Sequence, residues 1–200
     1  MKITKWSECP IDVFYELYDV VADKDTNIMK KNVKIISIIY EIPEDQVYAM
    51  SMEDYNKHMN ELEWVTTTPP FNSNFSTKSI TIDGTKYTVT PLDKLSIGQY
   101  IDFQTFWQKK DEQKYIGNIL ASFLVPKGHK YGEGYDILQL ANTLRTKLDI
   151  VTARNLMFFF LKKYLDLMVS SFIYLRRKMK TKEEKSQTTQ VLNTILDGLV

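Results

Sequence analysis

Few residues of this sequence could do chemistry, and the first candidates lie in a glycine-containing loop. Residues 127–135 (KGHKYGEGY) hold three of the seven glycines, and a glycine loop ahead of a helix can cradle phosphate. A P-loop, however, needs Gly-Lys-Ser or Gly-Lys-Thr opening a helix directly after a strand. Here a predicted helix and Pro126 precede the loop, and Glu133 stands between two glycines where an anion would bind. The pattern favours a plain loop between helices, with partner binding through Tyr131 and Tyr135 as the alternative.

The histidines and the cysteine form no recognisable catalytic or metal-binding pattern. His58 and His129 lie about 70 residues apart, and neither has a second ligand at helical spacing. Cys9 paired with one of them could form a thiolate nucleophile. Yet Cys9 directly precedes Pro10 at a predicted helix start, where a small residue is an ordinary choice. The residues therefore predict no catalytic group, no metal site and no cofactor, in a chain that is not an enzyme.

A basic run ends the longest predicted helix. Its five positive charges are Arg176, Arg177, Lys178, Lys180 and Lys182. Cations at a helix C-terminus are favourable and usually only solvated, and the alternative is contact with phosphates or with an acidic partner. No aromatic residue is interleaved after Tyr174, so a base-stacking surface is not indicated. Contact with nucleic acid is therefore a secondary expectation.

Composition indicates a globular protein of a reducing compartment. Hydrophobic residues make up 44% of the chain, enough for a core in one domain or in two small ones. A formal net charge of +1 points to neither nucleic acid nor membrane as the main partner. A single cysteine cannot form an internal disulfide, and the N-terminus lacks the apolar core of a signal peptide.

The longest apolar-rich stretch, residues 156–175, is predicted to be a buried helix rather than a membrane span. Lys162, Lys163 and Asp166 interrupt it, and each would cost about 2–3 kcal/mol at a bilayer centre. We expect a long helix at 154–180 to form the core of a second subdomain. The side chains expected to be strongly buried there are Leu156, Phe159, Leu165 and Phe172.

The clearest secondary structure is a β-hairpin. β-Branched and aromatic residues flank Asp83-Gly84 within residues 79–90, and this dipeptide tolerates the positive φ angles of a type I′ turn. The remaining apolar residues recur at helical spacing, bounded by Pro, Gly or capping residues, so about eight helices are expected. The fold class predicted is mainly α (α+β): helical subdomains with one isolated hairpin near residues 79–90.

Several helix boundaries are also predicted. The residues expected to mark them are Pro10 at the first helix start, Thr26 as cap of a second helix ending at Pro43, Ser51 as a further cap, Ser96 with Gln99 as a capping box, Pro126 closing a helix from Asp111, and Val191 to Leu199 as a last helix.

A polar segment with two prolines divides the chain. Residues 66–78 read as an extended linker, between an N-terminal helical subdomain at 1–65 and the hairpin plus C-terminal helical subdomain at 79–200. A more specific interpretation is that the linker is a docking arm, which places Phe71 and Phe75 on a neighbouring protein chain. An isolated hairpin is not stable alone, and its unpaired edges would suit strand addition by a partner.

The order of parts in residues 1–110 resembles proteins of tailed bacteriophages. The stretches IISIIYEIPEDQV and SMEDYNKHMNELEWV, a proline linker and ITIDGTKYTVTPLDKLSIGQYIDFQ follow one another. This layout is similar to small virion and tail-assembly proteins of gut phages, including crAss-like phages, and to phage tail assembly chaperones. The family brings no catalytic residues with it.

The resemblance implies a non-enzymatic role in phage morphogenesis through protein–protein contacts. The chain would be a virion component (tail, neck or cargo), in the virion or the host cytoplasm, with other phage structural or tail proteins or further copies of itself as partners. The partner-binding residues expected are Phe71, Phe75, Tyr131 and Tyr135. Two alternatives stay open: a tail assembly chaperone absent from the mature particle, and a host-takeover protein that binds a bacterial enzyme.

Overall fold

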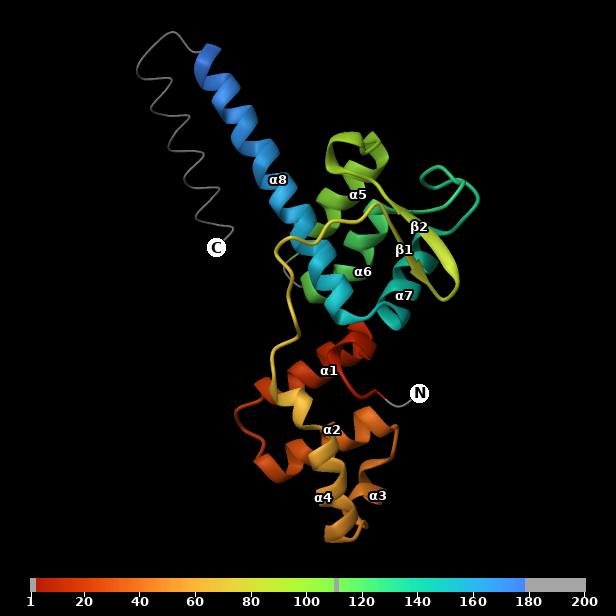
Figure 1. The fold of residues 1–200 in the computed structure, drawn as a ribbon, viewed down its shortest axis with the longest axis vertical. Helices are drawn as coiled ribbons and strands as arrows, with labels where there is room; N and C mark the ends of the chain where they lie inside the picture. The colour runs from red at the N-terminus through yellow and green to blue at the C-terminus, as the bar shows by residue number, and fades with distance from the viewer. Residues whose placement is uncertain (1–2, 110–111, 179–200) are drawn as a thin grey trace. The chain divides into compact units, whose positions relative to one another are not determined.

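The computed structural model describes residues 3–109 and 112–178, and in these residues the chain is mainly helical, as predicted (Figure 1). Two compact units comprise residues 1–157 and 158–200, and each is described by itself. The helices of the described residues are α1 (Ile11–Ala22), α2 (Ile28–Tyr40), α3 (Glu44–Tyr48), α4 (Met52–Glu61), α5 (Ile97–Trp107), α6 (Glu112–Phe123), α7 (Ile137–Lys147) and α8 (Ile150–Lys178). The predicted last helix at 191–199 lies outside the described residues.

Local capping explains where most helices begin. Pro10 precedes α1, and Ser96 and Gln99 form the predicted capping box of α5. The predicted cap of α2 was wrong: Asn27 accepts from the Lys30 N–H. The hydroxyl of Thr26 instead donates to Asp23 at 2.6 Å, so it closes the turn between α1 and α2.

The hairpin is confirmed, but it is not isolated. Strands β1 (Ser79–Ile82) and β2 (Thr85–Val89) flank Asp83 and Gly84, whose φ angles of 49° and 76° are those of the expected turn. A third strand, β3 (Leu124–Pro126), pairs antiparallel with β2. The sequence predicted helix up to Pro126, because an apolar run of three residues cannot be assigned to strand from its pattern alone. β3 covers the β2 edge that was expected to be open.

Helices α5, α6 and α7 form the core beside this sheet (Figure 1). The last five residues of α6, 119–123, are buried, including Leu120 and Phe123. Gly117 allows α7 to come close, since a Cβ at this position would lie 2.5 Å from the Ala141 carbonyl oxygen. Buried Gln99 donates from Nε2 to the Ser122 carbonyl at 2.9 Å, which satisfies a polar group inside the core.

The start of the chain is tied to the segment between α7 and α8. The Ile11 N–H donates to the Leu148 carbonyl, and the Ile150 N–H donates to the Cys9 carbonyl at 2.8 Å. Nearby, Arg145 Nε lies 2.7 Å from Asp12 Oδ1. α1 is therefore fixed by residues from the far end of the same unit.

Helix α8 begins at Ile150, earlier than the predicted 154. Leu156 is fully buried as expected, but Phe159 is only half-buried, so its predicted strong burial was wrong. Its neighbour Phe160 is the buried phenylalanine of this stretch, at 3% exposed. Leu165 and Phe172 have side chains outside those described. None of the described helices has the length and apolar content that crossing a membrane would need.

Candidate protein-docking groove

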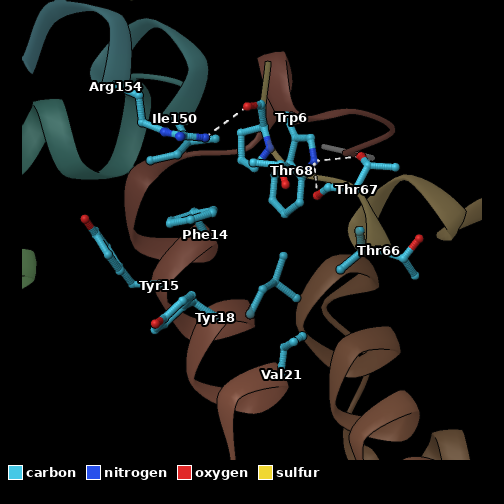
Figure 2. Close-up of a pocket in the computed structure, with 13 residues that line it drawn as sticks. Trp6, Phe14, Tyr15, Tyr18, Val21, Thr66, Thr67, Thr68, Ile150 and Arg154 are labelled. Carbon is cyan, nitrogen blue, oxygen red and sulfur yellow. Dashed lines mark hydrogen bonds between the residues drawn. The ribbon is translucent and has the colours of Figure 1, made fainter. Parts of the chain in front are cut away.

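A groove of about 470 Å³ lies in the first unit, between α1 and the chain that follows α4 (Figure 2). One wall is α1, and the other comes from Trp6 and residues 65–69. Leu17 and Ile150 lie at its base and are almost completely buried. The lining is thus mostly apolar and rich in aromatic rings.

The α1 wall is an apolar strip that faces solvent. Phe14, Tyr18 and Val21 follow the spacing i, i+4, i+7, so they share one face of the helix. Tyr18 is 50% exposed and Val21 54% exposed. Seven residues of helix span about 10 Å. This strip therefore presents about two helical turns of apolar surface.

The opposite wall is held in place by its own hydrogen bonds. Trp6 Nε1 donates to the Thr67 carbonyl at 3.1 Å, and Arg154 Nη1 donates to the Pro69 carbonyl at 2.9 Å (Figure 2). The Trp6 ring packs edge-on against Phe14, with centroids 5.6 Å apart. This wall is consequently ordered, and these polar groups are already engaged within the chain.

A smaller, polar hollow adjoins the groove across Tyr15, which lines both. Its charged residues are Asp12, Glu16, Asp19, Lys114 and Arg145. The Arg145 guanidinium pairs with Asp12 at 2.7 Å. Glu16 and Asp19 are exposed, and neither forms an ion pair with another described residue. The hollow therefore holds three carboxylates and two cations, and its charge is negative overall.

The loop tyrosines predicted as anchors are held in contacts of their own chain, and neither lines the groove. The Tyr131 hydroxyl donates to Asp102 Oδ2 at 2.6 Å. Burial, with the Asp102 carboxylate as second cause, raises the pKa of Tyr131 above its usual value. Tyr135 is half-buried and packs edge-on against His129, with centroids 6.2 Å apart. Their use as partner anchors stays a prediction.

The linker phenylalanines follow the groove wall in sequence but do not line it. Phe71 is 47% exposed, and Phe75 is half-buried. Between them, the Asn72 N–H donates to Asn155 Oδ1 at 2.9 Å. This bond and the Arg154 contact fasten the predicted linker to the first turns of α8. The docking role of the two rings and the predicted division at 66–78 stay predictions.

The residues considered for chemistry serve the fold. Cys9 is completely buried, and this burial, together with the Asp149 carboxylate, raises the pKa of its thiol to about 12. The His58 ring packs against Tyr40 with centroids 4.3 Å apart. His129 Nδ1 lies 3.2 Å from the Glu133 carbonyl oxygen. Across residues 3–109 and 112–178 the structure gathers no group of three side chains able to hold a metal ion.

The basic run is only partly within the described residues. Arg176, Arg177 and Lys178 form the last turn of α8, and their side chains are not described. Lys180 and Lys182 lie outside the described residues. Contact with phosphates or with an acidic partner therefore stays a prediction.

A second exposed apolar patch lies on α5. Ile97, Tyr100 and Ile101 share one helix face and are 80%, 47% and 55% exposed. The capping box and the buried Gln99 hold the helix itself in place. The patch is therefore exposed apolar surface on a helix that does not line the groove.

Sequence reasoning missed the groove because it noted only the helical spacing of the apolar residues of α1. The signal that could have shown it is the width of that stripe. Hydrophobic residues, tyrosine included, stand in α1 at 11, 13, 14, 15, 17, 18, 20, 21 and 22. They occupy more of the helix than one packed face can cover. Part of this set has to remain at the surface.

Comparison of the chain with protein-family models, with curated proteins and with solved structures gives no match.

Proposed function

We propose that this chain is a non-enzymatic protein that works by binding other proteins, and that it does so in tailed-phage morphogenesis as a component of the virion. The observation that carries the binding role is the aromatic groove beside α1. The phage setting is supported by the resemblance of residues 1–110 to virion and tail-assembly proteins.

Protein binding suits the groove because its exposed wall is both apolar and ordered. Aromatic side chains near the centre of an interface commonly dominate binding energy. Tyr18 and Val21 already lie exposed on a helix whose other side is buried through Ile11 and Leu17. Little ordering would be needed when a partner binds, which lowers the entropic cost of association.

Two measurements test this proposal together. Mass spectrometry of purified phage particles gives the presence and copy number of the chain. A photo-crosslinking amino acid at position 18, with the same amino acid at position 97 as control, shows which protein occupies the groove. We expect the chain at fixed copy number, and a crosslink from position 18 to another structural protein.

Other outcomes would change the assignment. Absence from particles, with a crosslinked tail protein in the infected cell, would favour the assembly chaperone. A crosslink to a bacterial enzyme would favour a host-takeover protein. A metal- or nucleotide-dependent activity that survives stringent purification would contradict the non-enzymatic role.

A further inference from the structure

We infer that the groove receives an amphipathic helix of another protein, with apolar side chains in the groove and a basic flank along Glu16 and Asp19. This inference rests on the proposed function, since it names the kind of partner that the same groove would hold. It makes two claims that can fail separately, one on the shape of the partner and one on its charge.

A helix fits this groove because the wall offers few hydrogen bonds to an incoming backbone. The Thr67 and Pro69 carbonyls already accept from Trp6 and Arg154, and the Thr67 N–H donates to Trp64. An extended peptide would need free donors and acceptors along a strand edge. A helix satisfies its own backbone, so it can bind through side chains alone.

The dimensions of the α1 strip agree with a helical partner. Phe14, Tyr18 and Val21 form a row along α1, and such rows pack between the side-chain rows of a neighbouring helix. A partner with apolar residues at i, i+4 and i+7 would present a matching row about 10 Å long. Helices that dock in grooves use this spacing for their anchors.

The charged residues beside the strip indicate which side chains the flank of the partner would carry. Glu16 and Asp19 point outward from α1, beside the strip and within the adjoining hollow. Arg145 is paired with Asp12 on the same helix, and Lys114 also lines the hollow, so part of the negative charge is balanced. On the opposite side the Arg154 guanidinium is bound to a carbonyl. Lysine or arginine on the partner would therefore be favoured along the α1 side.

The experiment measures binding of two synthetic helical peptides to the full chain by fluorescence anisotropy. Both peptides are about four turns long, with leucine at i, i+4 and i+7. One carries lysines along the flank, and its twin carries glutamates at the same places. The protein variants are Tyr18→Asp in the groove, Glu16→Lys with Asp19→Lys on the flank, and Ile97→Asp on α5 as the matched control. Unchanged thermal unfolding shows that each variant is folded.

We expect the lysine peptide to bind about tenfold more tightly than its twin at low salt. The double charge reversal should invert this order, and added salt should reduce the difference. Tyr18→Asp should weaken both peptides by about tenfold or more. Ile97→Asp should change neither.

Several results would overturn the inference, and the first two of them would leave the proposed function intact. Equal binding of both peptides, with no inversion on charge reversal, would refute the basic flank. Absence of peptide binding, while position 18 still crosslinks to a protein in particles, would refute the helical partner. A dimer of the chain that Tyr18→Asp dissociates would make a second copy the occupant. Binding of a small apolar dye that no peptide displaces would make the groove a small-molecule site. Loss of both the peptides and the crosslink would remove the proposed function as well.

Discussion

The Thr77 hydroxyl forms two hydrogen bonds with the backbone of Ser79: it donates to the carbonyl at 2.7 Å and accepts from the N–H at 3.3 Å. In the antiparallel register, Ile80 and Ile82 turn their backbone groups toward β2, so Ser79 and Thr81 turn theirs outward. Because β3 pairs with the other side of β2, the hairpin formed by β1 and β2 could add a further strand at the outer edge of β1. Thr77 occupies half of that edge, at Ser79. The edges predicted to be open for strand addition are therefore covered in part, β2 by β3 and β1 by Thr77 at Ser79.

Thr77→Val should increase self-association through β1. Valine has nearly the shape of threonine but cannot bind Ser79, so an N–H and a carbonyl would become available for pairing with another chain. Light scattering of concentrated protein over time measures this. Thr77→Ser keeps the hydroxyl and is the control. If both variants scatter equally, the hydroxyl does not protect the edge.

Gly117→Ala should lower the free energy of unfolding by about 1–3 kcal/mol. The new Cβ would lie 2.5 Å from the Ala141 carbonyl oxygen and 2.6 Å from Arg145 Cγ, so α6 and α7 would have to separate. Gly98→Ala is the matched control, because its Cβ would meet nothing closer than 4.0 Å. That change in α5 should be neutral or stabilising by up to about 1 kcal/mol. Urea unfolding compares the two, and equal effects would contradict close packing at Gly117.

Tyr131→Phe should lower stability at neutral pH by about 1 kcal/mol, through loss of the bond to Asp102. The folded-state pKa of Tyr131 lies above its usual value of 10.0, so its contribution is complete below that pH. The contribution is lost as pH rises past 10, because the unfolded chain then releases the proton while the folded chain keeps it. The difference between the two proteins should therefore shrink from pH 9 to about 11. Unfolding midpoints over this range test the sign, and a widening difference would contradict it.

Cys9 should resist alkylation by iodoacetamide in the folded protein at pH 8. Its side chain is completely buried, and the pKa of the thiol is raised to about 12, so almost no thiolate is present. The same protein unfolded in urea should react at the rate of a free cysteine. Mass spectrometry of the labelled chain measures both. Rapid labelling of the folded protein would show that Cys9 is accessible after all.

The features that could be predicted from the sequence are those set by neighbouring residues. Asp83-Gly84 specifies its turn, and Ser96 with Gln99 specifies the start of α5, because the partners lie within three residues of each other. β3 depends instead on pairing with β2, more than thirty residues earlier in the chain, and three apolar residues carry no period that would reveal it.

The groove could not be predicted from the sequence for a related reason. Which side of α1 remains exposed is decided by Trp6 and residues 65–69, and the Trp6 indole reaches Thr67, 61 residues away. Helical spacing identifies the apolar residues of α1 but does not say which of them another segment will cover. Phe159 and Phe160 are a second example. Both are apolar, and only their packing in the fold makes Phe160 buried and Phe159 half-buried.

The hydrogen bonds between the N-terminal segment and the residues before α8 also determine when the first unit can finish folding during synthesis. Asp12 and Arg145 are 133 residues apart, and ribosomes add about 5–20 residues per second. Once α1 has been made, roughly ten seconds therefore pass before Arg145 and Leu148 exist. During this interval α1 can pack on α2, but the Ile11 N–H lacks the Leu148 carbonyl to which it donates in the finished unit. A stall before residue 145 would therefore leave a fragment in which Asp12 has no Arg145 to pair with.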